Sequence, residues 1–404
     1  MSGKDEFHDD PFTGAAHMGR RAEWTENREG TGGIVNPPVW RASTILYPTI
    51  ADMDAANMRQ DSTLFYGRKG TPTHWALREA MTSLEPGAAG TMLYPSGVAA
   101  LAGAILSVAR PGDHILLPDS AYDPTSALAN GLLARLGIIW EPYDPLIGAE
   151  ITRLFRPETV LLLLESPGSL TFEVQDVPAM AAAAKAAGVT SLLDNTWAAS
   201  LHFKGIAHGC DMVMQAITKY VGGHSDLMMG SVSATPGHFE RLRATAWALG
   251  QCVSADDASL ALRGFRTLPT RMARHEASAL TIARWLKTHP LVSEVWHPAL
   301  PDCPGHTIWQ RDFSGSAGLF GVMLNRGSRA DAAALFDRLK LFGKGFSWGG
   351  YESLAVPTSP EKLRRLNPKH PHGLTLRLSI GLENPQDLIT DLTQALDHFA
   401  TATR

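Results

Sequence analysis

The sequence predicts an α/β protein built on a mostly parallel sheet of about seven strands, and two observations support this prediction. From about residue 61 onward, short apolar runs alternate with longer helix-like segments. The runs are mostly continuous rather than apolar at alternate positions, which is typical of strands covered by helices on both faces. The length of 404 residues allows two or three domains at roughly 150 residues each.

The first predicted domain covers residues 61–263. Its expected strands are the apolar runs at 91–94, 115–117, 138–140, 160–164, 190–193, 212–214 and 228–232. Helices are expected at 72–84, 98–109, 121–136 and 177–187. The first of these helices has Pro72 in its opening turn, where the missing N–H of proline does no harm.

Residues 1–60 are predicted to form an extended N-terminal arm. They lack sustained periodicity, and glycines at 30, 32 and 33 and a proline pair at 37–38 interrupt any regular element. We expect the apolar side chains of this arm to be covered rather than left in water. These side chains are Val39, Trp40, Ile45, Leu46 and Tyr47.

Residues 264–404 are predicted to form a smaller α+β domain. A long helical pattern at 272–288 comes first, and further helices are expected at 330–339 and 387–400. Strands are expected at 292–296, 319–324 and 374–380.

Composition excludes several functional classes. A net charge of −4 gives no general attraction to nucleic acid or to an anionic membrane. Cys210, Cys252 and Cys303 are widely spaced and form no disulfide framework, so a reducing compartment is expected. The acidic N-terminus has no apolar segment of a targeting signal, and the longest apolar run is too short to span a membrane. We therefore expect a soluble, cytoplasmic protein.

Polar residues follow four of the predicted strands. Ser96-Gly97 follows the run at 91–94, Glu165 follows 160–164, Asp194 follows 190–193, and Thr218-Lys219 comes shortly after 212–214. In open α/β sheets the ligand crevice lies outside the carboxyl ends of the strands, so these groups are expected to meet there. Taken singly, Ser96 is more simply a helix cap, Asp194 is equally well a turn cap, and Lys219 is an ordinary surface lysine.

Together these groups indicate pyridoxal phosphate. Its phosphate needs a helix N-terminus and hydroxyls, its ring nitrogen needs a carboxylate, and its aldehyde needs a lysine amine. A dinucleotide site is the competing interpretation. It is disfavoured because no G-x-G-x-x-G follows the first strand and no G-x-x-x-x-G-K-[ST] occurs in the chain. His224, Asp226 and Cys210 fit no standard zinc spacing, so no metal is assigned.

From about residue 30 to its end, the sequence resembles the pyridoxal-phosphate enzymes of cysteine and methionine metabolism, which have fold type I, like aspartate aminotransferase. The motifs that carry the resemblance are long and occur in the family's order. They are Tyr66-Gly67-Arg68, Ser96-Gly97, residues 194–198 (DNTWA), 215–220 (QAITKY), 223–226 (GHSD), 347–353 (SWGGYES) and 376–383 (LRLSIGLE).

Within that family, two departures favour the branch that cleaves a carbon–sulfur bond at the β-carbon. The γ-acting relatives usually carry E-S-P-[ST]-N-P, but residues 165–170 here read ESPGSL. They also usually have Leu and then Val or Cys where this chain has Trp348 and Tyr351. Residues 311–320 (RDFSGSAGLF) resemble the β-acting branch as well.

The resemblance implies a role for each matching residue. Lys219 would bind the cofactor aldehyde and then move protons, Asp194 would keep the ring nitrogen protonated, and Tyr122 would stack on the ring near the substrate amine. Arg377 would bind the substrate carboxylate through a planar fork, supported by Ser347 and Trp348. The phosphate would be held by Ser96, Gly97, Val98 and Thr218 of one subunit and by Tyr66 and Arg68 of a neighbour, with Tyr66 also reaching the substrate. A second hydroxyl that the family often has is replaced by Ala216.

The activity that the resemblance implies is β-elimination of L-cystathionine to homocysteine, pyruvate and ammonia, a transsulfuration step of methionine biosynthesis. Two alternatives stay within enzymes: a broader cysteine-S-conjugate or cystine β-lyase, and a γ-acting relative such as cystathionine γ-synthase or methionine γ-lyase. A cofactor-bearing binding or regulatory protein is a third. If Tyr66 and Arg68 complete a neighbour's site, the active unit is at least a dimer, and the resemblance implies a homotetramer. The modest charged fraction of 19% agrees with surface hidden in such an interface.

Overall fold

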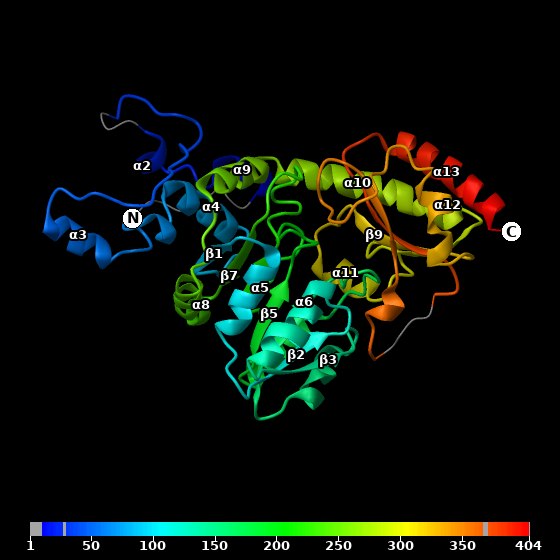
Figure 1. The fold of residues 1–404 in the computed structure, drawn as a ribbon, viewed down its shortest axis with the longest axis horizontal. Coiled ribbons are helices and arrows are strands. Elements are labelled where there is room, and N and C mark those ends of the chain that lie inside the picture. Colours follow the sequence, from blue (N-terminus) through cyan, green and yellow to red (C-terminus); the bar gives the residue numbers. More distant parts are fainter. Residues whose placement is uncertain (1–9, 27–29, 367–370, 404) are drawn as a thin grey trace.

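The computed structural model describes residues 10–26, 30–366 and 371–403. Figure 1 shows an elongated protomer with a large α/β unit in the middle, a second sheet with its helices toward the C-terminus, and an N-terminal arm at the opposite end. Residues 1–9 and 27–29 of the predicted arm lie outside the described residues. No helix in the described ranges is long and apolar enough to cross a membrane.

The central sheet has seven strands in the order β1-β7-β6-β5-β4-β2-β3, which confirms the predicted fold class. The strands are β1 (Gly90–Tyr94), β2 (His114–Pro118), β3 (Ile139–Tyr143), β4 (Thr159–Glu165), β5 (Thr190–Asp194), β6 (Met212–Gln215) and β7 (Gly230–Ala234). All seven predicted runs are strands. Only β7 breaks the parallel pattern, because it pairs antiparallel with both β1 and β6.

Alternate residues of each central strand enter different cores. In β4, Leu161 and Leu163 pack into the core beneath α5 (Gly97–Leu106) and α8 (Pro236–Ala248), whereas Leu162 and Leu164 pack on the opposite side with α4 (Pro72–Ser83) and α7 (Val177–Ala186). Because both faces of the strand are buried, its sequence is apolar at every position from 160 to 164. This burial is the physical origin of the continuous apolar runs in the sequence.

The C-terminal unit has its own four-stranded antiparallel sheet in the order β10-β11-β9-β8. Its strands are β8 (Val292–Trp296), β9 (Leu319–Leu324), β10 (Leu354–Thr358) and β11 (Thr375–Ser379), and its helices are α11 (His306–Asp312), α12 (Ala332–Phe336) and α13 (Pro385–Ala402). The long helix α10 (Leu268–Thr288) runs from the central unit into this one (Figure 1). The sequence patterns predicted α10, α12 and α13, but not α8, α9 (Ala255–Arg266), α11 or β10.

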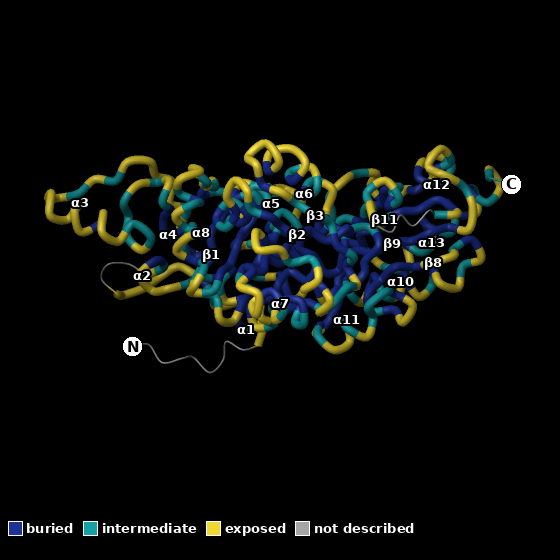
Figure 2. Tube along the Cα trace, turned by 90° about the horizontal axis from the view of Figure 1, so that it is seen from below, coloured by how far each residue is buried: buried dark blue, intermediate teal, exposed yellow. Residues whose placement is uncertain are grey.

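The N-terminal arm contains short helices, namely α1 (Pro11–His17), α2 (Ala22–Thr25) and α3 (Ile50–Asn57), joined by irregular segments. In Figure 2 the segment around α3 extends away from the body and is coloured mostly as exposed. Leu46 is 89% exposed, and Trp40 is 41% exposed. The expectation that the apolar side chains of the arm are covered is therefore wrong for Leu46 and Trp40 in the single protomer, whereas Val39, Ile45 and Tyr47 are partly buried.

Candidate active site

A cavity of about 340 Å³ lies at the carboxyl ends of the central strands. The loops after β1, β4, β5 and β6 form its floor, and residues from the segment before β10 and from β11 close it from the C-terminal unit. Most of the residues predicted for the site line this one cavity. They are Ser96, Gly97, Val98, Tyr122, Asp194, Thr218, Lys219, Ser347, Trp348 and Arg377.

One end of the cavity meets the N-terminus of α5. The Ser96 side chain accepts a hydrogen bond from the Ala99 backbone N–H at 3.1 Å, so Ser96 caps the helix. Gly97 packs against Ala216, whose Cβ would lie 3.0 Å from a Cβ at position 97. A helix N-terminus with free backbone N–H groups attracts anions, which fits a phosphate. The Thr218 hydroxyl donates to the Met229 carbonyl at 3.1 Å and accepts from the Met229 N–H at 2.9 Å.

Asp194 ends β5 at the floor of the cavity and is buried. Both the backbone N–H and the hydroxyl of Thr196 donate to its Oδ1, at 3.0 and 2.5 Å. Burial raises the pKa of Asp194, and the Thr196 bonds and the Lys219 charge oppose that shift. A buried acid of this kind needs a cationic partner in the cavity, and a protonated pyridine nitrogen supplies one.

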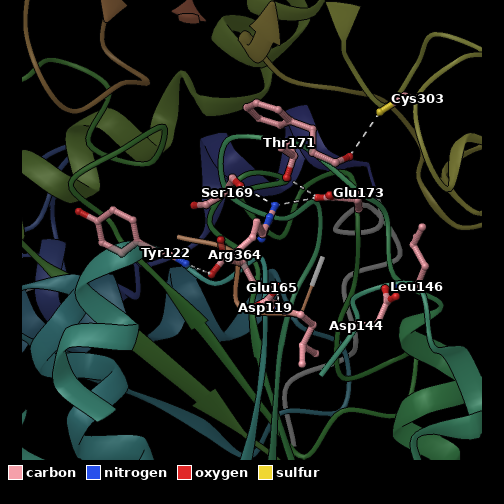
Figure 3. A network of polar contacts seen from close by, with 12 residues as sticks. Asp119, Tyr122, Asp144, Leu146, Glu165, Ser169, Thr171, Glu173, Cys303 and Arg364 are labelled. Carbon is pink, nitrogen blue, oxygen red and sulfur yellow. Dashed lines mark hydrogen bonds and ion pairs between the residues drawn. The ribbon is translucent and has the colours of Figure 1, made fainter. Parts of the chain in front are cut away.

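Glu165 stands beside Asp194, because β4 and β5 are parallel and these two residues are directly paired in register. Burial, and then the Asp194 charge, raise the pKa of Glu165 to about 8. Its Oε2 accepts the Tyr122 backbone N–H at 2.8 Å, which holds the start of α6 (Asp123–Leu128) over the cavity (Figure 3). Glu165 was not among the predicted site residues, although its place directly after an apolar strand was the signal.

The loop after β4 forms another wall of the cavity through Ser169 and Leu170. Arg364, from the loop after β10, donates to Glu173 Oε2 at 3.1 Å and to the Ser169 carbonyl at 3.3 Å, as Figure 3 shows. Both side chains of this ion pair are almost fully buried. A buried, hydrogen-bonded pair fixes the geometry of the segments it joins, so the C-terminal unit positions this wall.

Lys219 enters the cavity from the turn after β6. Its Nζ donates to Ser347 Oγ at 2.7 Å and lies 5.3 Å from the centre of the Trp348 ring. Burial and the nearby Arg377 charge lower the pKa of Lys219 to about 8, and Asp194 opposes them. An amine with such a pKa is partly neutral near physiological pH, as a nucleophile or a base requires.

Arg377 projects from the middle of β11 and is half-buried. Its Nη2 donates to the Ser347 carbonyl at 3.0 Å, and no ion pair within the described ranges involves it. Ser347 has a φ of 83°, a left-handed backbone conformation that costs a non-glycine residue free energy. The strained turn places the Ser347 hydroxyl at Lys219 and its carbonyl at Arg377.

Tyr66 and Arg68 do not line the cavity. Tyr66 is 44% exposed, and Arg68, also exposed, donates to the Trp247 carbonyl at 2.9 Å in its own chain. Tyr66 precedes the short turn Gly67–Lys69 at the base of the arm, and Arg68 lies within it. Their assignment to a neighbouring subunit's site stays a prediction.

The donor set fits pyridoxal phosphate. An anion-binding helix N-terminus, a buried acid and an amine of lowered pKa line one cavity together with the Arg377 guanidinium, which has no ion pair in the described residues. When bound, the cofactor supplies an electron-accepting ring that stabilises negative charge next to the substrate amine. The helix N-terminus matches the phosphate of the cofactor, the acid matches its ring nitrogen, and the amine matches its aldehyde.

Comparisons with known proteins agree with this chemistry. The sequence profile of the Cys/Met metabolism PLP-dependent enzymes matches residues 19–397. The chain is 43% identical over 373 residues to cystathionine beta-lyase MetC of Escherichia coli, covering 91% of this chain and 94% of that protein. It is 41% identical over 391 residues to the cystathionine beta-lyase of Haemophilus influenzae, covering 95% and 97%.

A solved structure shares the fold. The crystal structure of metB from Corynebacterium glutamicum superposes with a TM-score of 0.86 at 28% sequence identity, covering 96% of this chain and 98% of that one. The family profile spans most of the chain, and the matching relatives are covered almost from end to end. The protein therefore belongs to the Cys/Met metabolism PLP-dependent enzyme family.

Proposed function

We propose that this protein is a carbon–sulfur β-lyase that converts L-cystathionine to homocysteine, pyruvate and ammonia, in methionine biosynthesis in the cytoplasm. The observation that carries the proposal is that Lys219, Asp194 and Arg377 line one cavity at the carboxyl ends of the central strands. The two relatives named cystathionine beta-lyase, at 41 and 43% identity, support the choice of substrate.

Each residue has a defined task in this reaction. Arg377 binds the substrate carboxylate, since its guanidinium has no carboxylate partner in the described residues and forms a planar fork. Lys219 Nζ, once free, removes the proton from the substrate α-carbon and later returns protons, which its lowered pKa allows. Asp194 holds its negative charge against the ring nitrogen, and Ser347 Oγ orients the lysine amine.

The wall of the cavity supports β-cleavage over γ-cleavage. Ser169 and Leu170, which replace the usual Asn-Pro of γ-acting relatives, line the cavity together with Trp348. The Trp348 ring packs edge-on against Tyr220 at 5.3 Å and bounds the space next to Lys219. A broader S-conjugate lyase is the second candidate, because Leu170, Phe346 and Met228 make much of the cavity wall apolar.

We propose further that the active unit is an oligomer, a homotetramer with shared sites. Apolar side chains of the arm are exposed in the single chain, and Leu46, Ile50 and Met58 are the most prominent of them. Tyr66 and Arg68 stand outside their own cavity, at the base of the same arm. A neighbouring subunit would cover the arm and receive these two residues at its phosphate site.

Product identity tests the reaction. We expect cystathionine to yield pyruvate and homocysteine, with cystine as a poorer substrate, when keto acids are identified by chromatography over a panel of cystathionine, cystine, cysteine and methionine. Release of 2-oxobutyrate from cystathionine or methionine would instead establish γ-cleavage. Turnover of cystine at or above the rate of cystathionine would favour the broader S-conjugate lyase.

Removing Lys219 tests the attachment site. In the Lys219→Ala variant we expect no cofactor on the protein after borohydride reduction and mass spectrometry, and a fall in kcat of about three orders of magnitude or more. Lys204→Ala is the matched control, because Lys204 is also a largely buried lysine of lowered pKa but donates to the Ser200 carbonyl. Covalently held cofactor in Lys219→Ala would show that another lysine carries it.

The pH dependence follows from the pKa of Lys219, which is about 8. A protonated ammonium cannot accept a proton, so kcat should rise with pH up to about 8 and level off above that value. Steady-state rates in buffers from about pH 6 to 9 measure this profile. A rate that falls between about pH 6.5 and 8 would contradict the base role of Lys219.

Mixing two inactive variants tests the shared site. Arg68→Ala and Lys219→Ala should each be inactive or strongly impaired, but co-refolded mixtures should recover activity in hybrid dimers. Random pairing leaves about a quarter of the sites with both native residues, so about a quarter of the native rate is expected. If the mixture is no more active than Arg68→Ala alone, Arg68 does not act at a neighbouring subunit's site.

A further inference from the structure

The helix α10 carries a buried arginine that has no acidic partner. Arg271 is 5% exposed, and no ion pair in the described residues involves it. Its guanidinium binds only neutral groups, and burial lowers the pKa of Arg271 to about 10. Burying a cation without an ion pair costs free energy, so the surrounding backbone must supply carbonyl oxygens that accept its N–H groups.

Two of the groups that bind Arg271 belong to the turn that carries Lys219. Nη1 donates to the Tyr220 carbonyl at 2.7 Å, and Nη2 donates to the carbonyls of Gly264 at 2.8 Å and Val221 at 3.3 Å. The carbonyl of Lys219 itself accepts the Gly223 N–H at 2.8 Å. The three carbonyls from residue 219 to 221 are thus all held, two of them by one side chain.

Two glycines show how tightly this contact is built. Gly223, part of the motif at 223–226, has a φ of 69°, and a Cβ there would lie 2.0 Å from Arg271 Nη1. A Cβ on Gly264 would lie 2.5 Å from the Val221 carbonyl oxygen. Only glycine fits at both places, so the close approach of the α9–α10 junction to the lysine turn accounts for these residues.

The next turn of α10 reaches the other half of the site. His275, four residues after Arg271 and on the same face, bonds through Nδ1 to the Ile380 carbonyl at 2.7 Å and packs its ring on Tyr220. Ile380 directly follows β11, the strand that carries Arg377. One helix face therefore contacts both the lysine turn and the end of the strand that carries the arginine.

We propose that Arg271 is a positioning residue for Lys219: by holding the carbonyls of Tyr220 and Val221 it fixes the direction of the lysine side chain relative to Arg377. The proposal rests on the proposed function of Lys219. Arg271 does not line the cavity and touches no reacting atom. It acts through backbone geometry, to which reaction rates are sensitive at the scale of about 1 Å.

The test compares Arg271→Lys with Arg266→Lys in the holoenzyme. Both replacements keep the charge and lose the planar fork. Arg266 is the control, because it is also largely buried without an ion pair in the described residues, but its Nη1 donates to the carbonyls of Ala15 and Met18 in the arm rather than to the lysine turn. Thermal unfolding should show comparable destabilisation of the two variants.

Only Arg271→Lys should change the chemistry. We expect its kcat for cystathionine to fall about 10-fold or more while KM changes less than about 3-fold. The midpoint of the pH titration of the cofactor absorbance should rise by about 0.5 unit or more, because a loosened turn lets water reach the Lys219 nitrogen and favours its protonated form. The other titratable or charged groups that share the cavity are Asp194, Glu165, Tyr122 and Arg377, and they are unchanged in both variants.

The proposal is overturned if Arg271→Lys matches Arg266→Lys in kcat and in titration midpoint. Failure of the proposed function is a separate result, seen when Lys219→Ala retains bound cofactor. Should Arg271→Lys not fold, Thr267→Val removes the hydroxyl that accepts from Arg271 Nε at 3.1 Å and donates to the Gly264 carbonyl at 3.3 Å. Its kcat should fall about 3-fold against a Thr245→Val control on α8, and an unchanged rate would equally overturn the proposal.

Discussion

Parallel pairing of β4, β5 and β6 is the constraint on which the rest of the site depends. Because these strands run in the same direction, Glu165, Asp194 and the turn of Lys219 emerge at one edge of the sheet. The strands themselves are buried on both faces, so their ends are the first places where polar groups can stand. Two covering cores hold the strands in register, and that register brings the carboxylates of Glu165 and Asp194 together.

Burial then acts in opposite directions on the groups gathered there. It raises the pKa of Asp194 and Glu165 and lowers the pKa of Lys219, because in each case the charged form loses its water. In the proposed site a basic cofactor ring would give Asp194 a cationic partner, while the Arg377 charge lowers the pKa of the lysine amine. The cavity thus contains a buried carboxylate that requires a cationic partner and an amine whose pKa is lowered. Both properties come from burial in the fold and not from the residue type alone.

The C-terminal unit completes the site by contacts that cross between the two sheets. The strained turn at Ser347 bonds Lys219 through its hydroxyl and Arg377 through its carbonyl. Arg364 fixes the loop after β4, and α10 ties the lysine turn to the end of β11. The relative position of the two units therefore sets the distance between Lys219 and Arg377, the residues proposed as the base and as the binding site of the substrate carboxylate.

The sequence alone determined the seven central strands, the mostly parallel sheet and the set of polar residues at its carboxyl edge, because continuous apolar runs and residues directly after them are local signals. It could not determine that Glu165 pairs with Asp194, that Arg364 and Arg271 hold the loops of the cavity, or that the arm is exposed in one protomer. Those features arise between residues distant in the chain, and strand β10 was missed because its Pro357 and irregular flanks hide the strand pattern. Periodicity records which face of an element is buried, but only the tertiary structure decides what lies against that face.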